Sequence, residues 1–319
     1  MIPTNNKKEK ILAVFTVIFL FIVVGSLLFL ISLNNKKNTD TLRLLVREQQ
    51  ARNETVKNFQ NIQANGPATS TLTSKSYLSL AFIDTGTKKN IQEKNPNLVL
   101  PIASITKLMV GVITLENIDL ETEVTATVNY IGREESAFVL EDGKTYKTGE
   151  LLMNALISSD NDSARLLSSI LGENNFIDKM NTKAAELGMT STHYANVTGL
   201  DPATSTQDIN TSTVTDLANL LSYIIEKHPD LLKITTKTSY NVCDINNYCK
   251  LVTNTDKLLG NPDFRHKIIG GKTGSTDLAG KNLALVVNFS NNIFLINIVL
   301  GSENSFFDTT SLINNIVIK

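Results

Sequence analysis

The sequence predicts a single α+β domain, in which helices flank an antiparallel sheet beside a mostly helical subdomain, preceded by one transmembrane helix. Three observations lead to this prediction. Residues 11–33 carry no charged side chain, helical patterns fill the middle of the chain, and residues 77–84 together with two apolar runs near the C-terminus are typical of strands. A strand at the start and a strand pair at the end indicate that both ends of the domain meet in one sheet.

The composition is that of an ordinary globular protein. The 319 residues are 42% hydrophobic and 19% charged, with a formal net charge of -1 and a pI of about 6.3. Nucleic-acid binding needs a dense basic face, which this charge balance does not offer, so no nucleic-acid partner is expected. The three histidines do not stand at the spacings of zinc ligands, and neither a metal nor another cofactor is expected.

The first 33 residues have the pattern of a membrane anchor. As a helix, residues 11–33 would reach roughly 35 Å, and the core of a bilayer is about 30 Å thick. The alternative is a cleaved signal peptide, whose apolar core would span only about 7–15 residues. We therefore expect residues 1–10 in the cytoplasm and residues 11–33 as an uncleaved transmembrane anchor in the lipid bilayer.

The charges that flank this run give a conflicting indication of its orientation. More basic residues follow the run than precede it, and the positive-inside rule then favours a cytoplasmic body. The basic residues before it are Lys7, Lys8 and Lys10, and those after it are Lys36, Lys37, Arg43, Arg47 and Arg52.

Residues 34–76 are expected to form a stalk or linker, and residues 77–319 the folded body. The segment 39–63 is polar and helix-prone, and residues 64–71 are mostly small. In the body, Thr148 can cap one helix, and a tight turn joins the last two strands into a hairpin that is buried on both faces. The expected helices cover residues 104–118, 149–157, 162–171, 176–187 and 214–226, and the expected strands cover residues 77–84, 283–289 and 293–300.

Cys243 and Cys249 are the only cysteines, and they flank a polar turn. The sequence around them predicts a hairpin, across which a disulfide would form in an oxidising compartment. A pair of free thiols is the alternative.

The first chemical motif is Ser104-Ile105-Thr106-Lys107, at an expected helix start. Residues i and i+3 share a helix face, so the hydroxyl of Ser104 and the amine of Lys107 can meet. A serine hydroxyl becomes a nucleophile when a base takes its proton, and a lysine is such a base only while burial and a nearby cation keep it neutral. Alone, the motif could equally be a solvated helix face.

The second motif is Ser159-Asp160-Asn161, in a polar break between two expected helices. On such a turn the hydroxyl of Ser159 could relay a proton to a leaving amine, and the amide of Asn161 could hold a substrate carbonyl. Capping of the following helix is the structural alternative.

The third motif is Lys272-Thr273-Gly274, just before the C-terminal apolar strands. A lysine at a strand edge offers a cation to a carboxylate, a threonine adds a hydroxyl, and a glycine lets a substrate backbone approach closely. A plain glycine-rich turn is the alternative. A second Lys-Thr-Gly sequence, at residues 147–149, opens an expected helix, and helix capping explains it there.

These motifs follow one another in the order S-x-x-K, S-x-N and K-T-G, which is the signature of penicillin-binding proteins and class A β-lactamases. From residue 77 to the C-terminus, the chain resembles the serine D-alanyl-D-alanine carboxypeptidases, the low-molecular-mass penicillin-binding proteins. The resemblance rests on residues 101–109, 157–164, 180–201, 271–274 and 279–280.

The resemblance implies a fold like that of the serine β-lactamases and D,D-peptidases, and a role for each motif. Ser104 would attack the carbonyl of a terminal D-Ala-D-Ala bond, Lys107 would accept its proton, and Ser159 would help to pass that proton to the departing D-alanine. Water would then release the acyl-enzyme. The substrate-binding residues would be Asn161, Lys272, Thr273, Gly274 and Ser275.

Within that set, Asn161 would orient the peptide, and Lys272 and Thr273 would hold its terminal carboxylate. The backbone N–H groups of Ser104 and Ser275 would form the oxyanion hole. The charge of Lys272 would also help to keep Lys107 neutral. Peptidoglycan stem peptides would be the substrates, and β-lactams would be inhibitors.

The chain departs from many relatives in two respects. It ends soon after its last expected strand, without a second β-rich domain or a C-terminal amphipathic anchor, and its second motif contains Asp160, which is usual in class A β-lactamases. Those enzymes also need a carboxylate that activates water, and no Glu-x-x-Leu-Asn segment follows. A β-lactamase, a D,D-endopeptidase and an inactive wall-binding or sensor homologue are therefore the alternatives.

Peptidoglycan lies outside the cytoplasmic membrane. This location leads us to expect a single-pass cell-membrane protein whose catalytic domain is extracytoplasmic, in spite of the lysine distribution. An oxidised cysteine pair would agree with that compartment.

Overall fold

The structure is a computed structural model that describes residues 24–26, 36, 39–67, 71–83, 86–132, 140–204, 208–290 and 292–319. The chain forms two compact units, Met1–Lys57 and Asn58–Lys319, and residues 39–61 are helical. The expected transmembrane helix over residues 11–33 lies outside the described residues, except for residues 24–26, which are helical. Among the residues that are described, no helix has the length and apolar character needed to cross a membrane.

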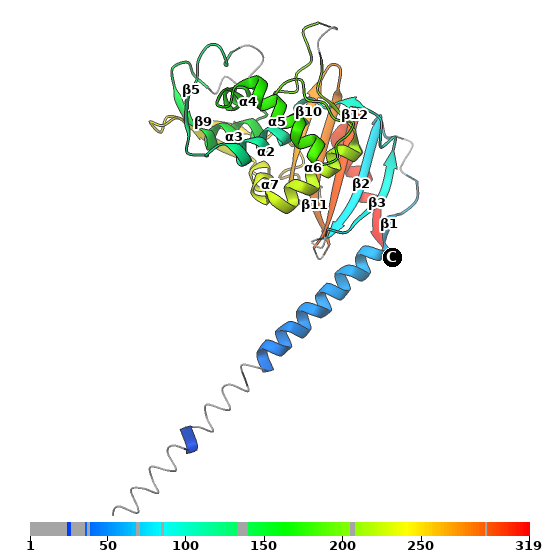
Figure 1. Cartoon of the computed structure of the whole chain (residues 1–319). Helices are drawn as coiled ribbons and strands as arrows, with labels where there is room; N and C mark the ends of the chain where they lie inside the picture. The colour runs from blue at the N-terminus through cyan, green and yellow to red at the C-terminus, as the bar shows by residue number, and fades with distance from the viewer. Residues whose placement is uncertain are drawn as a thin grey trace, which may run out of the picture. The chain divides into compact units, whose positions relative to one another are not determined.

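The second unit is built on a five-stranded antiparallel sheet (Figure 1). Its strand order is β10-β11-β12-β2-β3, so that the last three strands of the sheet in sequence lie beside the first two. This arrangement confirms the predicted α+β class and the predicted meeting of both chain ends in one sheet. The strands are β2 (Ser76–Ile83), β3 (Lys88–Lys94), β10 (Lys267–Thr276), β11 (Gly280–Ser290) and β12 (Ile293–Ser302).

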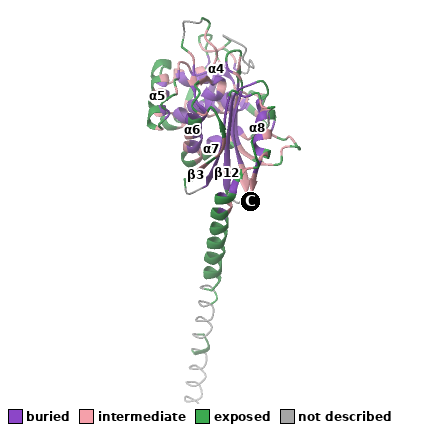
Figure 2. Ribbon diagram, turned by 90° about the vertical axis from the view of Figure 1, so that its right-hand side faces the viewer, coloured by how far each residue is buried: buried purple, intermediate pink, exposed green. Residues whose placement is uncertain are grey.

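Both faces of this sheet are buried along its central strands, in which most residues are apolar. In β11, Leu283 and Leu285 belong to one apolar cluster, whereas Ala284 and Val286 belong to another on the opposite face. Figure 2 shows these buried strands between α6 (Val214–Lys227) and α7 (Pro229–Thr235) on one side and α8 (Ser305–Asn314) on the other. The predicted hairpin buried on both faces is therefore confirmed.

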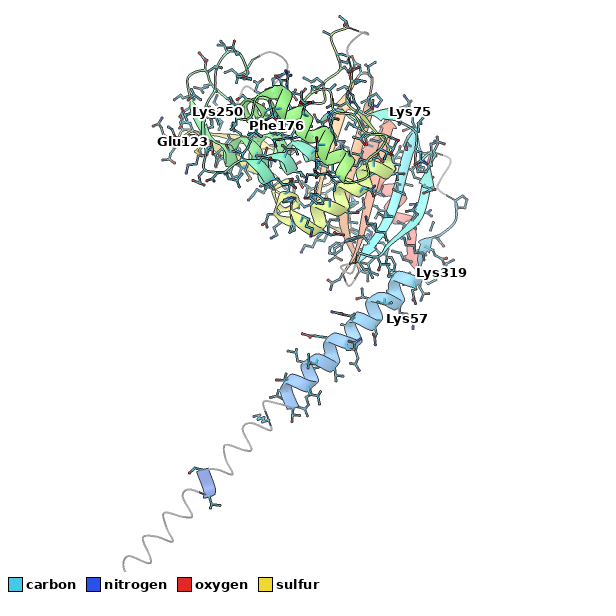
Figure 3. The ribbon with its side chains drawn as sticks, viewed as in Figure 1. Lys57, Lys75, Glu123, Phe176, Lys250 and Lys319 are labelled. Carbon is cyan, nitrogen blue, oxygen red and sulfur yellow. A yellow bond between two sulfur atoms is a disulfide. The ribbon has the colours of Figure 1, made fainter. Side chains whose placement is uncertain are left out.

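The helical subdomain packs beside the sheet edge that is formed by β10. Its largest fully buried side chains include Phe176 on α5, which Figure 3 labels. A short 3-10 turn, η1, leads into this subdomain and contacts both β10 and β11. Its elements are η1 (Ala103–Thr106), α2 (Lys107–Asn117), α3 (Thr148–Ile157), α4 (Asn161–Ser169) and α5 (Glu173–Glu186), with the short strand pairs β4 (Leu100–Pro101) with β7 (Thr211–Ser212) and β5 (Glu123–Thr125) with β6 (Thr145–Lys147).

A disulfide-closed hairpin lies against the helical subdomain. It consists of β8 (Ser239–Cys243) and β9 (Cys249–Thr253), and the sulfur atoms of Cys243 and Cys249 are 2.00 Å apart. Glu150 on α3 accepts hydrogen bonds from the hydroxyl of Tyr240, at 2.8 Å, and from the backbone N–H of Cys243, at 2.9 Å. These contacts attach the hairpin to α3, and its second strand leads directly towards residue 255.

The compact unit begins earlier than residue 77, the boundary that the sequence suggested. A short strand, β1 (Ile62–Ala64), pairs antiparallel with the last strand, β13 (Ile316–Ile318). Phe59 and Ile62 are buried in the apolar cluster beneath α8. These two side chains, which lie in the segment expected to be a stalk or linker, are therefore part of the core.

One local prediction is wrong. Thr148 does not cap α3: it is the first residue of the helix, Lys147 occupies the N-cap position, and the Thr148 hydroxyl donates to the carbonyl of Thr122 at 3.1 Å. The edge strand β3, the seven-residue helix α7 that follows α6, and the C-terminal helix α8 lay outside the predictions. Proline begins α7 because the first turn of a helix has no use for its missing N–H.

Candidate active site

Ser104 and Lys107 lie on consecutive helical segments, because the expected helix start is a 3-10 turn. Ser104 belongs to η1, and Lys107 is the first residue of α2. The Nζ atom of Lys107 is 2.9 Å from the Oγ atom of Ser104, as the i, i+3 spacing predicted. Lys107 is fully buried, whereas Ser104 is partly exposed at the base of a cavity.

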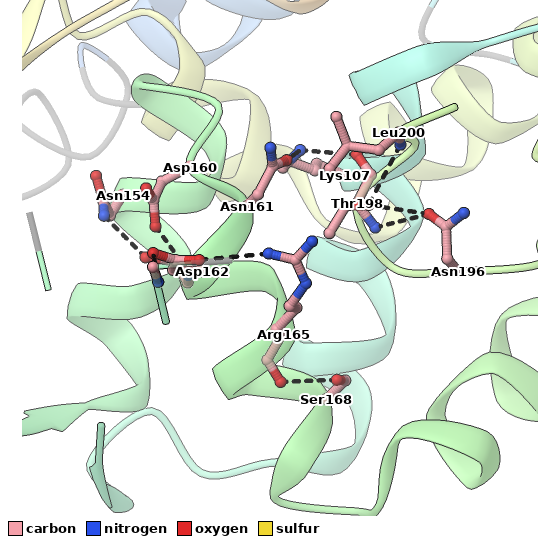
Figure 4. Close-up of polar contacts among 12 residues, drawn as sticks. Lys107, Asn154, Asp160, Asn161, Asp162, Arg165, Ser168, Asn196, Thr198 and Leu200 are labelled. Atoms are coloured by element: carbon pink, nitrogen blue, oxygen red, sulfur yellow. Dashed lines mark hydrogen bonds and ion pairs between the residues drawn. The ribbon is translucent and has the colours of Figure 1, made fainter. Parts of the chain in front are cut away.

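Two further oxygen atoms surround the amine of Lys107 (Figure 4). Its Nζ donates to Oδ1 of Asn161 at 2.7 Å and to the carbonyl of Thr198 at 2.8 Å. A neutral amine has two N–H groups and one lone pair, and the two carbonyl groups take both N–H groups. When Lys107 is neutral, its lone pair can face the hydroxyl of Ser104 at 2.9 Å, and the amine can then accept the proton of that hydroxyl.

Backbone strain is concentrated next to the nucleophile and in the second motif. Five non-glycine residues of the described chain have a positive φ, and three of them are asparagines, which tolerate this conformation. The other two are Ala103, at φ 49°, and Ser159, at φ 65°. Such conformations persist only where the surroundings hold them, and they cluster at functional sites.

The turn that carries Ser159 and Asn161 is fixed by hydrogen bonds to its neighbours, several of which appear in Figure 4. Oδ1 of Asp160 accepts from the backbone N–H of Ser163 at 2.7 Å and so caps α4. Burial raises the pKa of the Asp160 carboxyl above its ordinary value. The capping alternative proposed for this motif is therefore correct for Asp160, while Asn161 remains directed at Lys107.

The third motif lies on β10, the edge strand that faces η1. A Cβ atom on Gly274 would be 2.8 Å from the carbonyl oxygen of Ile102 and 3.1 Å from the backbone nitrogen of Ser104. Only a glycine therefore allows the strand to pass this closely, and the contact brings Ser275 beside the nucleophile segment.

Lys272 is buried on β10, and its Nζ donates to the carbonyl of Thr273 at 3.1 Å. Burial lowers the pKa of Lys272 to about 7, against an opposing effect of the nearby carboxylate of Asp256. The sequence suggested a fixed cation at this position. Burial therefore disfavours the charged form of this lysine.

The motifs open into one cavity of about 340 Å³. Ser104, Ser159, Thr273, Gly274 and Ser275 from the predicted site all line it. Lys107 and Asn161 reach it through their contacts with Ser104 and with each other. The remaining lining residues are Thr255, Lys281, Asn282, Ser305 and Phe306.

Sequence reasoning missed the residues that reach the site from other parts of the chain. Thr198 contributes a backbone carbonyl, which no side-chain pattern could reveal. Thr255 follows the disulfide hairpin, and its hydroxyl is 2.5 Å from that of Thr273. Lys281 lies on β11, opposite Ser275. A strand register between β10 and β11 would have predicted the position of Lys281, but the sequence alone did not fix that register.

A serine hydroxyl beside a buried lysine amine, with a second buried lysine on the facing strand, defines a class: serine hydrolases that use lysine as their base. A family model described as D-alanyl-D-alanine carboxypeptidase matches residues 62–304 of the chain. The chain belongs to this D-alanyl-D-alanine carboxypeptidase family.

Individual relatives agree with this assignment. A D-alanyl-D-alanine endopeptidase of Pseudomonas aeruginosa is 32% identical over 243 residues, which are 73% of this chain and 75% of that protein. The crystal structure of a D-alanyl-D-alanine carboxypeptidase from Mycobacterium tuberculosis H37Rv has a TM-score of 0.69 at 27% identity, and the match covers 79% of this chain and 94% of that one. Penicillin-binding protein D2 from Listeria monocytogenes, in its ampicillin-bound form, has a TM-score of 0.64 at 26% identity, over 77% of this chain and 98% of that one.

Proposed function

We propose that this serine D,D-peptidase cleaves peptidoglycan stem peptides that end in D-Ala-D-Ala, through an acyl-enzyme on Ser104. The observation that carries the proposal is the position of the Lys107 amine. It donates to two carbonyl oxygens at 2.7 and 2.8 Å and lies 2.9 Å from the Ser104 hydroxyl, so a neutral Lys107 is placed to accept the proton of that hydroxyl.

The first half of the reaction forms the acyl-enzyme. The Oγ atom of Ser104 bonds to the carbonyl carbon of the penultimate D-alanine, and its proton passes to Lys107. The backbone N–H groups of Ser104 and Ser275 stabilise the oxyanion. The C–N bond then breaks, and Ser159 helps to deliver a proton to the amine of the leaving D-alanine.

The second half releases the product. Water attacks the ester carbonyl and gives a proton to the amine of Lys107, the C–O bond to Ser104 breaks, and Lys107 returns the proton to the Oγ atom of Ser104. Asn161 contacts Lys107 and keeps its amine in position, while the hydroxyl of Thr273 and the charge of Lys272 hold the terminal carboxylate.

Carboxypeptidase activity is our first candidate, and D,D-endopeptidase activity is the second. The second is favoured by the likeness to the Pseudomonas aeruginosa protein, which is an endopeptidase. Both activities use the same acyl-enzyme and differ in the amine that leaves. Incubation with defined muropeptides and mass analysis of the products distinguishes them: loss of one terminal D-alanine indicates a carboxypeptidase, and cleavage of cross-linked dimers indicates an endopeptidase.

β-Lactams are the proposed inhibitors, since they acylate the nucleophile of such sites. The similar Listeria monocytogenes protein was solved in its ampicillin-bound form. The described residues that line the cavity include no carboxylate that could activate water against such an acyl-enzyme, which favours a peptidase over a β-lactamase. Slow nitrocefin turnover is expected, and sustained fast hydrolysis would favour the β-lactamase instead.

The central test uses a fluorescent penicillin. The wild-type protein should acquire a covalent label at Ser104, and Ser104→Ala should acquire none while it keeps the wild-type unfolding temperature. Absence of label on the folded wild type would contradict both the acyl-enzyme and its assignment to this serine, and would favour an inactive wall-binding or sensor protein.

We also propose that residues 11–33 anchor the protein in the cell membrane and that the catalytic domain lies outside it. The support is the uncharged run of residues in the sequence and the bonded pair Cys243 and Cys249, which fits an oxidising compartment. The protein should stay with membranes during a carbonate wash, and protease added to spheroplasts should digest the catalytic domain. Recovery of a shortened soluble form would support a cleaved signal peptide.

A further inference from the structure

Lys281 is a basic residue that lines the cavity but belongs to none of the three motifs. It lies on β11 directly opposite Ser275 on β10, and both residues line the cavity. Residues opposite each other in an antiparallel pair project from the same face of the sheet, about 5 Å apart. Thr273 lies two residues before Ser275 and therefore projects from that face as well.

The predicted carboxylate site needs a cation of this kind. Lys272 is buried with a pKa of about 7, and its amine already donates to the carbonyl of Thr273 at 3.1 Å. Burial thus works against its charged form, and its contact with that carbonyl leaves it directed at the strand backbone. The hydroxyls of Thr255 and Thr273 are 2.5 Å apart at the same wall and can donate hydrogen bonds, but they carry no charge.

Lys281 can supply the missing charge. Its side chain is exposed to solvent, and no carboxylate of the described chain lies within ion-pair distance of its amine. The described lining of the cavity contains no acidic residue that would compete with a substrate carboxylate. Phe306 forms part of the same wall, and an apolar ring there reduces the number of water molecules around a bound anion.

We propose that Lys281 is a positioning residue for substrate: it attracts the C-terminal carboxylate of the peptide and directs it to the hydroxyls of Thr255 and Thr273. The proposal rests on the proposed D,D-peptidase function. Lys281 takes no part in proton transfer, and its contribution is a charge at the far wall of the cavity. It should therefore raise the rate at which the substrate is captured. This effect should weaken as the ionic strength of the solution rises.

The test compares three variants with the wild type. Lys281→Met removes the charge and keeps most of the aliphatic stem, Lys281→Arg keeps the charge, and Lys267→Met is the matched control, because Lys267 is an exposed lysine at the opposite end of β10. For each protein, the second-order rate constant of acylation is measured with benzylpenicillin and with its methyl ester, at low and at physiological ionic strength.

Lys281→Met should acylate about fivefold more slowly with benzylpenicillin at low ionic strength, and its rate should respond less to salt. Its rate with the uncharged ester should stay within about twofold of the wild type, since only the carboxylate meets the lysine. Lys281→Arg and Lys267→Met should behave like the wild type with both compounds.

If Lys281→Met lowers the acylation rate equally with benzylpenicillin and with its methyl ester, the inference is overturned, because a merely structural role would slow both reactions. Unchanged rates in Lys281→Met would overturn it as well. In either case a wild type that acylates normally leaves the proposed function standing. A folded wild type that acylates with neither compound would instead contradict the proposed function, and the inference with it.

Discussion

Gly199 lies so close to Ala103 that a Cβ atom on the glycine would be 2.0 Å from the carbonyl oxygen of the alanine. The same Cβ atom would be 2.9 Å from the backbone nitrogen of Ser104. Both residues have a positive φ, 82° for Gly199 and 49° for Ala103. Gly199, which follows Thr198, thus packs against Ala103, the residue before the nucleophile, and its missing side chain leaves room for the strained backbone of Ala103.

This contact makes Gly199→Ala a sharp probe of the nucleophile segment. The added methyl group must displace the Ala103 carbonyl, and with it the N–H and hydroxyl groups of Ser104. We expect penicillin acylation to fall by at least about 100-fold, since small misplacements of catalytic groups have effects of this size. The measurement is the rate of covalent labelling at 25 °C.

Gly172→Ala is the matched control. Gly172 has nearly the same φ, 81°, but nothing lies within 4 Å of its ideal Cβ position. It should lose roughly 1 kcal/mol of unfolding free energy from backbone strain alone and keep its acylation rate. If Gly199→Ala behaves like this control, the close approach to Ala103 does not position Ser104.

The second prediction separates the charge of Lys107 from its basicity. Lys107→Arg keeps a cation in the site, but a guanidinium cannot serve as a base at any ordinary pH. Acylation by penicillin should fall by about 1,000-fold or more, the size expected when general-base catalysis is lost. A rate within tenfold of the wild type, in a protein that stays folded by circular dichroism, would assign the base to another group.

The third prediction concerns pH and Lys272. Burial lowers its pKa to about 7, whereas an unfolded lysine keeps its proton up to about pH 10.4. Between these values the unfolded chain binds more protons than the folded one, so the free energy of unfolding rises as the pH rises. As the pH falls towards 7 this stability is lost, and below pH 7 both states bind the proton, so Lys272 adds no further pH dependence.

Denaturant unfolding of the wild type and of Lys272→Met measures this effect. The stability of the wild type relative to the variant should increase by on the order of 3 kcal/mol between pH 7 and pH 9.5. The affinity for a carboxylate substrate should change in the opposite direction, because the cation is lost over the same range. A pH-independent difference between the two proteins would show that Lys272 titrates outside this window.

The fourth prediction concerns the disulfide. Cys243 and Cys249 are six residues apart, and opening so short a loop should lower the free energy of unfolding by about 2 kcal/mol. The double variant Cys243→Ser/Cys249→Ser should therefore unfold at a lower temperature. Its penicillin labelling at 25 °C should persist, because the contacts of Glu150 still attach the hairpin to α3. Loss of labelling below the unfolding transition would show that the disulfide itself positions Thr255.

The parts of the site that depend on residues close together in the sequence could be predicted. Ser104 and Lys107 meet because they are three residues apart near a helix start, and Asn161 follows a polar break that had to be a turn. The glycine at residue 274 was expected to admit a substrate backbone, and the structure shows that it also admits the close approach of Ile102 and Ser104. Each of these inferences needs only the geometry of one helix, turn or strand.

The rest depended on contacts between distant segments. The carbonyl of Thr198 reaches Lys107 across 91 positions of the chain, and Thr255 meets Thr273 only after the disulfide hairpin folds back. The pKa of Lys272 depends on burial, which no motif expresses. Thr148 was assigned as a cap from its type, but its hydroxyl found a partner in Thr122 and Lys147 became the N-cap, because tertiary contacts override local propensity.

The pairing of β1 with β13 joins the two ends of the folded unit. Ile62 lies opposite Ile318, and the backbone N–H of Lys319 donates to the carbonyl of Asn61 at 3.3 Å. The first and last strands of the folded unit are therefore neighbours, and circular permutation is open to it: a short linker could join residue 319 to residue 58, and new termini could be placed between β11 and β12.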